Sequence, residues 1–437
     1  MWGNNTGVSQ GLIPGRKFWG PLMLVAIPPI FVHILWHTNY NCGGSFARMF
    51  SEMLDSPAEQ LPRAFQSPLD PMAWQIIAVY VVVQAALMRF VPGKEYVGPT
   101  TNCGNVPIYK ANGVQTFVCS ILLFLAGQHL GLYNGGVIYN HSGHLLTSMN
   151  LLALTFCELL YIKGRVAPSS TDSGHTGNPV FDYYWGTELY PRIFGWDVKQ
   201  FTNCRFGMVF WPLSTISYAF AQYERYGYVA DSMWVNMLLQ LIYCTKFFMW
   251  ETGYLASMDI QHDRAGYYLC WGCMCFLPTL YTSHTFYLTE HPVILGMPLA
   301  LAIFVAGALC IFVNYDCDRQ RATFRAHNGK VKIWGADAQY IKAKYRTEKG
   351  IRDSTLLYSG WWGMARHFHY VPEILASFFW SLPALFTHFM PYFYVVYLII
   401  LLTDRAHRDD ARCGAKYGKY WVDYCKKVPS KIIPGLY

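Results

Sequence analysis

Charged residues are scarce in this sequence. Asp, Glu, Lys and Arg make up 14% of its 437 residues, whereas 53% are hydrophobic and 17% are aromatic. This is too little polar material to coat a soluble globule of such a size. The composition therefore excludes an ordinary soluble domain and predicts a protein that resides in a membrane.

Three further absences narrow the class. Arg16 and Lys17 precede an apolar segment longer than a typical signal-peptide core, and no small-residue cleavage site follows. The first span is therefore expected to act as its own insertion signal. The 13 cysteines are odd in number and scattered, which argues against a disulfide framework. Cys270, Cys273 and Cys275 have a spacing that suggests a metal site, but small packing residues in a helix explain them better, and no metal is expected.

Apolar stretches of about the length that crosses a bilayer recur along the chain. They lie near Phe18–Trp36, Met72–Val91, Val114–Tyr133, His144–Ile162, Gly207–Tyr223, Met233–Trp250, Gly266–Tyr281 and Ile294–Asn314, with a pair in 371–402. The pattern predicts an all-α, multi-pass transmembrane helix bundle of about ten spans, in which the short stretch 266–281 is tilted or broken. We expect one membrane domain over 1–437, with the substrate side in 1–314 and a cofactor-binding part in 315–437.

Positive charge is concentrated in one loop near the end of the chain. Its basic residues are Arg319, Arg321, Arg325, Lys330, Lys332, Lys342, Lys344, Arg346, Lys349 and Arg352. Loops rich in Lys and Arg stay on the cytosolic side of a membrane. The loop is therefore expected in the cytosol, where a reduced nicotinamide cofactor is available.

Cationic, aromatic and acidic residues gather in two short stretches, 359–370 and 405–421. The apolar segment Ile374–Leu402 between them is long enough to enter a bilayer and return, so both clusters are expected at the same membrane face. Guanidinium groups bind phosphate oxygens in pairs, and nearby rings stack on a flat heterocycle. A nucleotide is the ligand that this combination favours.

The sequence has no Gly-x-Gly-x-x-Gly after a strand, which excludes a Rossmann dinucleotide site by motif. The nucleotide must be held in another way. Arg321 and Arg325 are four residues apart, so a helix would place both on one face as a clamp for a phosphate. Basic residues at a membrane edge can instead snorkel to the interface or set the topology of the chain. This alternative to phosphate binding applies to isolated basic residues.

The two clusters resemble those of the sterol reductase family, which comprises Δ14-, Δ7- and C-24(28)-sterol reductases and the membrane half of the lamin B receptor. Gly177–Arg192 resembles the family's other signature, with Phe181 where Tyr or His is usual. Tyr109–Gly113 and Asp259–Asp263 are also similar, so the resemblance covers roughly 85–437. The family binds NADPH, and its members reduce sterols that enter from the lipid phase.

Within the family, the run Ala365–Glu373 and the segment Ala167–Gly174 resemble the Δ7 branch. Phe368 stands where the Δ14 branch tends to carry Pro. The resemblance thus implies NADPH-dependent reduction of the C7–C8 double bond of a 5,7-diene sterol in sterol biosynthesis. Reduction at Δ14 is the alternative.

The resemblance also assigns cofactor contacts, residue by residue. They are Leu357, Trp362, His369, Tyr370, Arg405, Asp409, Cys413, Lys416, Tyr417 and Tyr424. His369 departs from a frequent Asn, but both side chains offer a hydrogen-bond donor and acceptor. A carboxylate beside phosphate would be repelled, so Asp409 is expected to bind ribose hydroxyls or an adenine amine, or to orient Arg405 or Arg408. A surface salt bridge is the alternative for Asp409 and more so for Asp410.

Reduction of an alkene that lacks a carbonyl group needs a proton on one carbon and hydride on the other, in a shielded pocket. Ionisable groups at apolar positions are the candidate donors. They are Glu251, Asp259, His262, Asp263 and Tyr281. On a helix, Asp259 would face His262 and Asp263, which permits a carboxylate–imidazole relay. Helix capping, or pairing of the two aspartates with Arg264, is an equal alternative.

Other readings are an isoprenylcysteine-type membrane methyltransferase, whose C-terminal half is similar, and a lamin-B-receptor-like scaffold. The long N-terminal membrane region and Gly177–Arg192 argue against the first reading. A first span within some twenty residues of the start leaves no room for a chromatin-binding head, which argues against the second. We expect no nucleic-acid partner, and association with other enzymes of sterol biosynthesis is allowed. The expected location is the endoplasmic reticulum in a eukaryote or the inner membrane in a bacterium.

Overall fold

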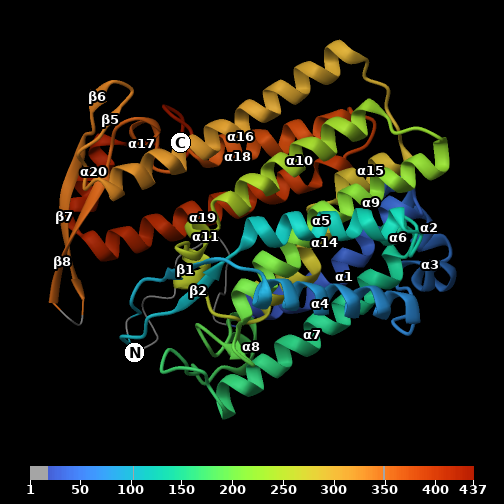
Figure 1. Cartoon of the computed structure of the whole chain (residues 1–437), viewed down its shortest axis with the longest axis horizontal. Coiled ribbons are helices and arrows are strands. Elements are labelled where there is room, and N and C mark those ends of the chain that lie inside the picture. The colour runs from blue at the N-terminus through green and yellow to red at the C-terminus, as the bar shows by residue number, and fades with distance from the viewer. Residues whose placement is uncertain (1–17, 102, 348–349) are drawn as a thin grey trace. The chain divides into compact units, whose positions relative to one another are not determined.

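The computed structural model describes residues 18–101, 103–347 and 350–437, and helices dominate it (Figure 1). Three residues used in the predictions of membrane insertion and of the basic loop lie outside the described residues. They are Arg16, Lys17 and Lys349. The chain forms two compact units. Among the described residues, the N-terminal unit comprises those from Phe18 to Leu301 and from Ser381 to Tyr394, and the C-terminal unit comprises those from Ala302 to Trp380 and from Val395 to Tyr437.

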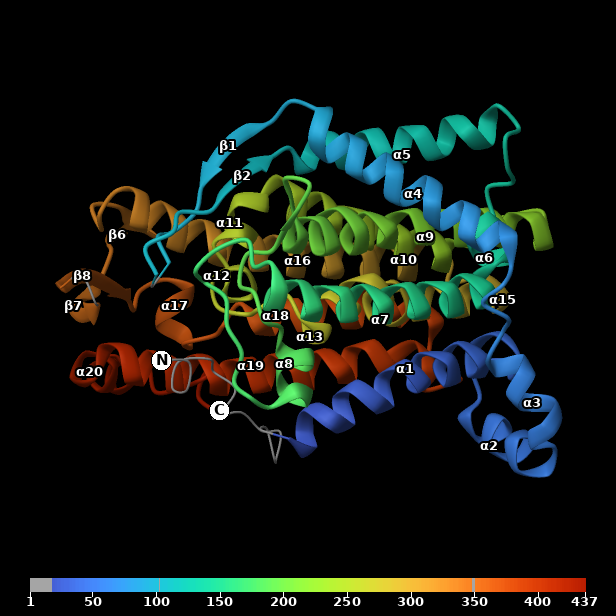
Figure 2. The same cartoon turned by 90° about the horizontal axis from the view of Figure 1, so that it is seen from below.

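Long helices joined by short hairpins and turns make up the N-terminal unit. Its first half contains α1 (Trp19–Tyr40), α2 (Phe46–Asp55), α3 (Pro57–Ala64), α4 (Pro71–Phe90), β1 (Lys94–Val97), β2 (Ile108–Ala111), α5 (Gly113–His129), α6 (Val137–Asn140) and α7 (Ser142–Val166). Within this unit, α2, α3 and α6 lie at one end of the long helices and the β1–β2 hairpin lies at the other (Figure 2).

The second half of this unit begins with the short helix α8. It contains α8 (Pro179–Trp185), β3 (Arg192–Ile193), β4 (Trp196–Asp197), η1 (Gln200–Gly207), α9 (Met208–Tyr226), α10 (Asp231–Met249), α11 (Glu251–Leu255), α12 (Met258–Gln261), α13 (Tyr267–Trp271), η2 (Gly272–Phe276), α14 (Leu277–Leu280), α15 (Ser283–Glu290) and, later in the chain, η3 (Leu382–Ala384) and η4 (Met390–Tyr392). The strands pair as the antiparallel hairpins β1–β2 and β3–β4.

Helix boundaries follow local chemistry. The Asp70 side chain accepts a hydrogen bond from the Ala73 amide at 2.7 Å, and Pro71 occupies the first helical position of α4. Both features are typical of helix starts, because they satisfy or remove amides that lack an intrahelical partner. Helix α9 ends at Gly227, whose φ of 76° is a left-handed conformation that glycine adopts without strain.

Two π-helical turns interrupt the helical run of the N-terminal unit. The segment η1 leads directly into α9, and the Tyr80 hydroxyl donates to the η1 carbonyls of Arg205 (3.0 Å) and Phe206 (2.6 Å). The segment η2 separates α13 from α14. The prediction that 266–281 is broken is thus confirmed, with a π-helical turn as the break.

The C-terminal unit combines three long helices with hairpins. Its elements are α16 (Met297–Ala326), β5 (Lys332–Ile333), β6 (Ala336–Asp337), β7 (Tyr340–Thr347), β8 (Gly350–Leu357), α17 (Trp361–Met364), α18 (Tyr370–Ser381), α19 (Phe393–Tyr417) and α20 (Lys419–Lys427). Strands β7 and β8 are antiparallel, with Lys344 opposite Asp353. Within this unit, β5 to β8, α17 and α20 gather at the C-terminal end of α16 (Figures 1 and 2).

Each predicted apolar stretch coincides with helical structure, so the prediction of a mostly helical fold is confirmed. Among the described residues, four helices are long and apolar enough to cross a membrane: α1, α4, α7 and α16. The number of about ten spans stays a prediction. The purely all-α description was wrong in detail, because four two-stranded hairpins are present.

Candidate functional site

Trp362 is a buried ring in the polar cluster of the C-terminal unit. Its indole N–H donates to the Cys317 carbonyl at 2.9 Å. The guanidinium carbon of Arg321 lies 4.3 Å from the ring centroid, and an Arg321 nitrogen lies 3.6 Å from Asp318. The ring packs in a hydrophobic cluster with Phe324, Ile333 and Leu357. A guanidinium group stacked on a ring keeps in-plane N–H groups available to an anion.

The loop before α18 adds rings to this cluster. His369 lies 5.0 Å from Trp362 and 4.3 Å from Tyr370, between ring centroids. The Asn314 side chain donates to the His369 carbonyl at 2.9 Å, which fixes the loop against α16. The buried His367 stacks on Tyr370 at 5.3 Å. These contacts preorganise a surface of aromatic faces.

Asp409 on α19 joins the second sequence cluster to the first. Its carboxylate lies 3.9 Å from His367 Nε2 and 2.5 Å from Arg412, and accepts from the Cys413 thiol at 3.7 Å. Burial alone would raise the pKa of Asp409, but Arg412, His367 and Arg321 together hold that pKa below its ordinary value. Burial lowers the pKa of His367 to about 4, against the opposing effect of the carboxylates. At neutral pH, a carboxylate therefore faces a neutral imidazole.

Neighbouring Asp410 has a different setting. Its carboxylate lies 3.3 Å from Arg366 and 3.3 Å from Lys431. Arg366 also donates to the carbonyls of Val428 and Pro429, each at 2.8 Å. This ion-pair group ties the end of the chain to the loop before α18, which favours the salt-bridge alternative for Asp410.

The β7–β8 hairpin contributes to the same cluster. The Lys416 ammonium lies 4.2 Å from the Tyr345 ring centroid and 5.1 Å from that of Tyr417. The hydroxyls of Tyr417 and Ser354 are 3.3 Å apart. These contacts place the hairpin beside the C-terminal end of α19.

The remaining predicted cofactor residues lie on the same elements. Arg325 is exposed one turn beyond Arg321 on α16, as the spacing predicted. Arg405 is half-buried one turn before Asp409 on α19. The buried Tyr424 donates its hydroxyl to the Trp362 carbonyl at 3.4 Å. All twelve predicted residues therefore belong to the C-terminal unit.

The donor set suits a dinucleotide phosphate. Arg321 and Arg325 project from one face of α16, and the buried Nε of Arg412 has no hydrogen-bond partner in the described part of the chain. An orphaned cationic N–H beside stacked rings fits an anionic heterocyclic ligand. The residues present are therefore compatible with a nicotinamide cofactor.

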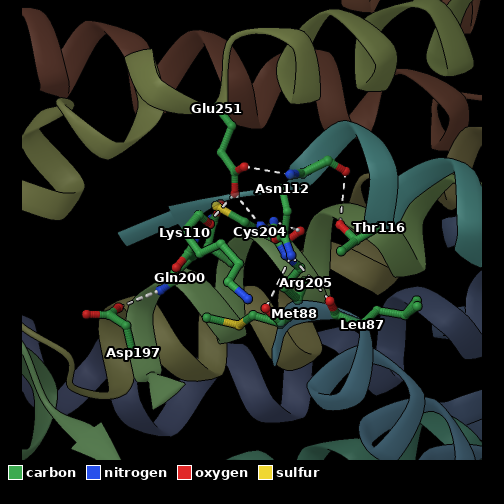
Figure 3. A network of polar contacts seen from close by, with 12 residues as sticks. Leu87, Met88, Lys110, Asn112, Thr116, Asp197, Gln200, Cys204, Arg205 and Glu251 are labelled. Carbon is green, nitrogen blue, oxygen red and sulfur yellow. Dashed lines mark hydrogen bonds and ion pairs between the residues drawn. The ribbon is translucent and has the colours of Figure 1, made fainter. Parts of the chain in front are cut away.

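Glu251, one of the predicted proton donors, lies in a buried network in the N-terminal unit (Figure 3). Its carboxylate is 2.6 Å from Arg205 and accepts from the Gly113 amide at 2.7 Å and from Gln200 at 3.2 Å. Arg205 also donates to Asn112 at 2.8 Å. The Asn112 amide donates in turn to the carbonyls of Leu87, Met88 and Val91. A buried carboxylate that accepts this many hydrogen bonds holds the surrounding segments together, so the geometry favours a structural role.

The segment that contains Asp259, His262 and Asp263 wraps around a buried lysine. The Lys199 ammonium donates to three carbonyls, those of Asp259 (3.3 Å), Ile260 (2.5 Å) and Asp263 (2.9 Å). Burial lowers the pKa of Lys199 to about 8, although nearby carboxylates oppose this shift. The expectation that one helix carries all three residues was wrong, because α12 ends at Gln261 and the next two residues lie beyond it. The relay itself stays a prediction. The short segment turns its backbone toward the ammonium.

Tyr281 belongs to an aromatic cluster in the N-terminal unit. Its ring centroid lies 4.5 Å from that of Tyr394 and 5.2 Å from that of Trp211. The five predicted donors thus fall into three settings: the Arg205 network, the Lys199 segment and this ring cluster. Among them, Tyr281 has electron-rich faces around it, as a developing carbocation would need.

Sequence reasoning missed the hairpin residues Tyr345 and Ser354 and the contact of Asp316 with Trp361. The indole N–H of Trp361 donates to Asp316 at 2.8 Å, and Asp316 also binds Arg319 at 2.5 Å. The alternation of side chains in 340–347 was a usable signal of a strand. No local pattern pointed to Asp316, because its partner is 45 residues away.

A family model described as the ergosterol biosynthesis ERG4/ERG24 family matches residues 37–437. The chain belongs to this family. A 7-dehydrocholesterol reductase from Arabidopsis thaliana is 50% identical over 418 residues, covering 95% of this chain and 96% of that protein. A 7-dehydrocholesterol reductase from Xenopus laevis is 38% identical, covering 84% and 79%. A Delta(14)-sterol reductase from Methylotuvimicrobium alcaliphilum is 34% identical, covering 97% and 96%. Family membership covers both units, including the polar cluster on α16 and α19.

Proposed function

We propose that this chain is an NADPH-dependent sterol reductase that reduces the C7–C8 double bond of a 5,7-diene sterol. The observation that carries the proposal is the 50% identity to the plant 7-dehydrocholesterol reductase over nearly the whole of both chains. The lower identity of 34% to the bacterial Delta(14)-sterol reductase supports the Δ7 branch over the Δ14 branch. We further propose that the protein crosses a membrane about ten times and resides in the endoplasmic reticulum if it is eukaryotic or in the inner membrane if it is bacterial.

In this proposal the polar cluster of the C-terminal unit holds NADPH. Arg321 and Arg325 would bind its phosphates, while Trp362, His369 and Tyr370 would contact its rings. The neutral His367 beside Asp409 leaves the carboxylate able to accept from ribose hydroxyls. The cofactor supplies hydride when bound.

The chain itself must deliver the proton. We assign this step to Tyr281, whose hydroxyl would protonate one carbon of the alkene while hydride reaches the other. The rings of Trp211 and Tyr394 would stabilise the developing positive charge. Glu251, Asp259, His262 and Asp263 would then support the fold around Arg205 and Lys199.

The decisive experiment supplies the purified full-length protein with NADPH and, separately, with a 5,7-diene sterol, a Δ14 sterol and a Δ24(28) sterol. Products are identified by mass spectrometry, and the diene is followed by its ultraviolet absorbance. Loss of absorbance with the 5,7-diene alone supports the proposal. Turnover of the Δ14 sterol alone would assign the chain to the other branch. Methyl transfer from S-adenosylmethionine in place of reduction would overturn both.

A further inference from the structure

A hollow of about 270 Å³ lies in the N-terminal unit, apart from the residues assigned to reduction. It is bordered by the end of α4, the β1–β2 hairpin and the β3–β4 hairpin. Figure 3 shows Lys110, Asp197 and Gln200, three of the residues that line it, beside the Arg205 network. Its lining is polar at the base and cationic at the rim.

Two buried acceptors form the base. The side chains of Asp197 and Tyr109 are 4% and 3% exposed. Asp197 Oδ1 accepts from the Gln200 amide at 2.9 Å, but within the described ranges Asp197 Oδ2 and the Tyr109 hydroxyl have no hydrogen-bond partner. A buried polar atom without a partner costs about 1–3 kcal/mol. A ligand that donates hydrogen bonds would remove this cost at both atoms.

Charge at the base points to a cationic donor. Burial raises the pKa of the Asp197 carboxyl above its ordinary value, although Lys199 and Arg192 oppose this shift, and burial also raises the pKa of Tyr109, with Asp197 adding to that effect. A positive group at the base would compensate the buried carboxylate. A primary ammonium meets this need, because it carries three donors in a small volume.

Three cations border the hollow. The Arg192 guanidinium donates to the Ile108 carbonyl at 2.6 Å, and the Lys110 ammonium donates to the Arg89 carbonyl at 2.6 Å. The Arg89 guanidinium carbon lies 5.9 Å from the Trp196 ring centroid. Each of these contacts uses only part of the donor capacity of the cation. The carboxylate of Glu95 also lines the hollow, but the three cations outnumber it, so the rim is suited to an anion such as phosphate.

The surroundings are apolar and lie at the end of a candidate span. Helix α4 ends at Phe90, which is 79% exposed, and Phe194 in the β3–β4 turn is 91% exposed. Ile108 at the rim is 47% exposed. The end of a membrane helix lies at the depth of lipid headgroups. A polar hollow with exposed apolar residues at this depth fits an amphipathic ligand.

We propose that this hollow binds a phosphoethanolamine group, with the ammonium on Asp197 and Tyr109 and the phosphate on Arg89 and Arg192. The headgroup of a phosphatidylethanolamine lipid and free phosphoethanolamine share this chemistry. A choline headgroup is excluded, because a quaternary ammonium has no N–H to donate to the two buried acceptors.

The test uses the purified full-length protein in nanodiscs that contain equal amounts of phosphatidylethanolamine and phosphatidylcholine. Native mass spectrometry after gentle removal of bulk lipid counts the retained lipid of each kind. We expect at least tenfold preference for the ethanolamine lipid. In a second arm, calorimetry measures binding of soluble phosphoethanolamine, phosphocholine and inorganic phosphate to the delipidated protein. Binding of soluble phosphoethanolamine without lipid retention would assign the site to the free compound.

Variants separate the site from the fold. Asp197→Asn keeps the oxygen that accepts from Gln200 but removes the charge, so the preference for ethanolamine over choline should be lost while the protein stays folded. Arg192→Gln should weaken retention of the ethanolamine lipid and leave retention of the choline lipid unchanged. Asp55→Asn, an exposed carboxylate on α2, is the matched control and should change nothing. Equal retention of both lipids by the unmodified protein, an unchanged preference in Asp197→Asn, or binding of neither compound overturns the proposal.

Discussion

Two cations of the N-terminal unit and two cations of the C-terminal unit are held in opposite ways. In the N-terminal unit, Arg205 and Lys199 are fully buried and each is surrounded by oxygen acceptors. In the C-terminal unit, Arg321 faces a ring and Arg325 is exposed. A buried cation that is surrounded by acceptors serves the fold, because its removal leaves its partners uncompensated. A cation over a ring with donors to spare can serve a ligand.

The largest effect should come from breaking the buried pair. Arg205→Met leaves the Glu251 carboxylate buried without its cation, and we expect a loss of about 3–5 kcal/mol in the free energy of unfolding. Denaturation of the detergent-purified protein, followed by tryptophan fluorescence, measures this loss. Arg48→Met is the matched control, because Arg48 pairs with Glu52 at an exposed position and its replacement should cost far less stability. Equal effects of the two substitutions would remove the contrast between buried and exposed cations.

Tyr281→Phe tests whether the aromatic cluster has a chemical role. Loss of a proton donor should lower kcat by about 10²–10⁴-fold, with a small effect on stability, because only a hydroxyl is removed. Steady-state turnover of the 5,7-diene sterol measures kcat. Tyr243→Phe changes another ring that contacts Trp211 and serves as the control. An undiminished kcat in Tyr281→Phe would move the donor role to the Lys199 segment.

On the C-terminal side, Arg321→Gln should raise the KM for NADPH about tenfold to a hundredfold, because a hydrogen bond to a charged group contributes about 1.5–3 kcal/mol. The effect on kcat should be smaller. Arg319→Gln lies two residues away on α16 and pairs with Asp316, so its KM should stay close to that of the unmodified protein. If both variants shift KM equally, general electrostatic attraction accounts for the effect.

The smallest effect should come from His367. Its pKa in the folded protein, about 4, lies below the ordinary value of 6.5, so only the unfolded chain takes up this proton between those values. The stability that His367 contributes is therefore lost as pH falls from about 6.5 toward 4, by about 2 kcal/mol between pH 7 and pH 5. His367→Gln should lose less stability over that interval. The exposed His327→Gln should behave like the unmodified protein.

The sequence predicted the helices well because bilayer-length apolar runs are a strong signal. Ile294–Asn314 corresponds to α16, although that helix continues to Ala326 through polar residues that hydropathy alone reads as a loop. The β7–β8 hairpin was not predicted, because the many basic residues in 340–357 hide the alternation of side chains that marks a strand. Interaction with α20 and α19 stabilises the hairpin, and that tertiary information is absent from a local pattern.

The candidate site was predicted unevenly. Helical spacing correctly put Arg321 and Arg325 on one face, and the two clusters meet through His367 and Asp409. That both clusters lie at the same membrane face stays a prediction. The Asp259 relay could not be judged from sequence, because whether a short helix extends by one more turn depends on what it packs against. Here that neighbour is Lys199, which lies 60 residues earlier.

The π-helical turn η1 requires its segment, Gln200–Gly207, to keep a fixed number of residues. It carries Arg205 and leads without a break into α9, which is buried along most of its length. Deletion of one residue from Gln200–Gly207 would tighten the wide π-helical turn to an ordinary α-helical one and change the direction in which its own side chains project, including that of Arg205. Insertions and deletions in this polar segment should therefore be tolerated far less than its surface-loop appearance suggests.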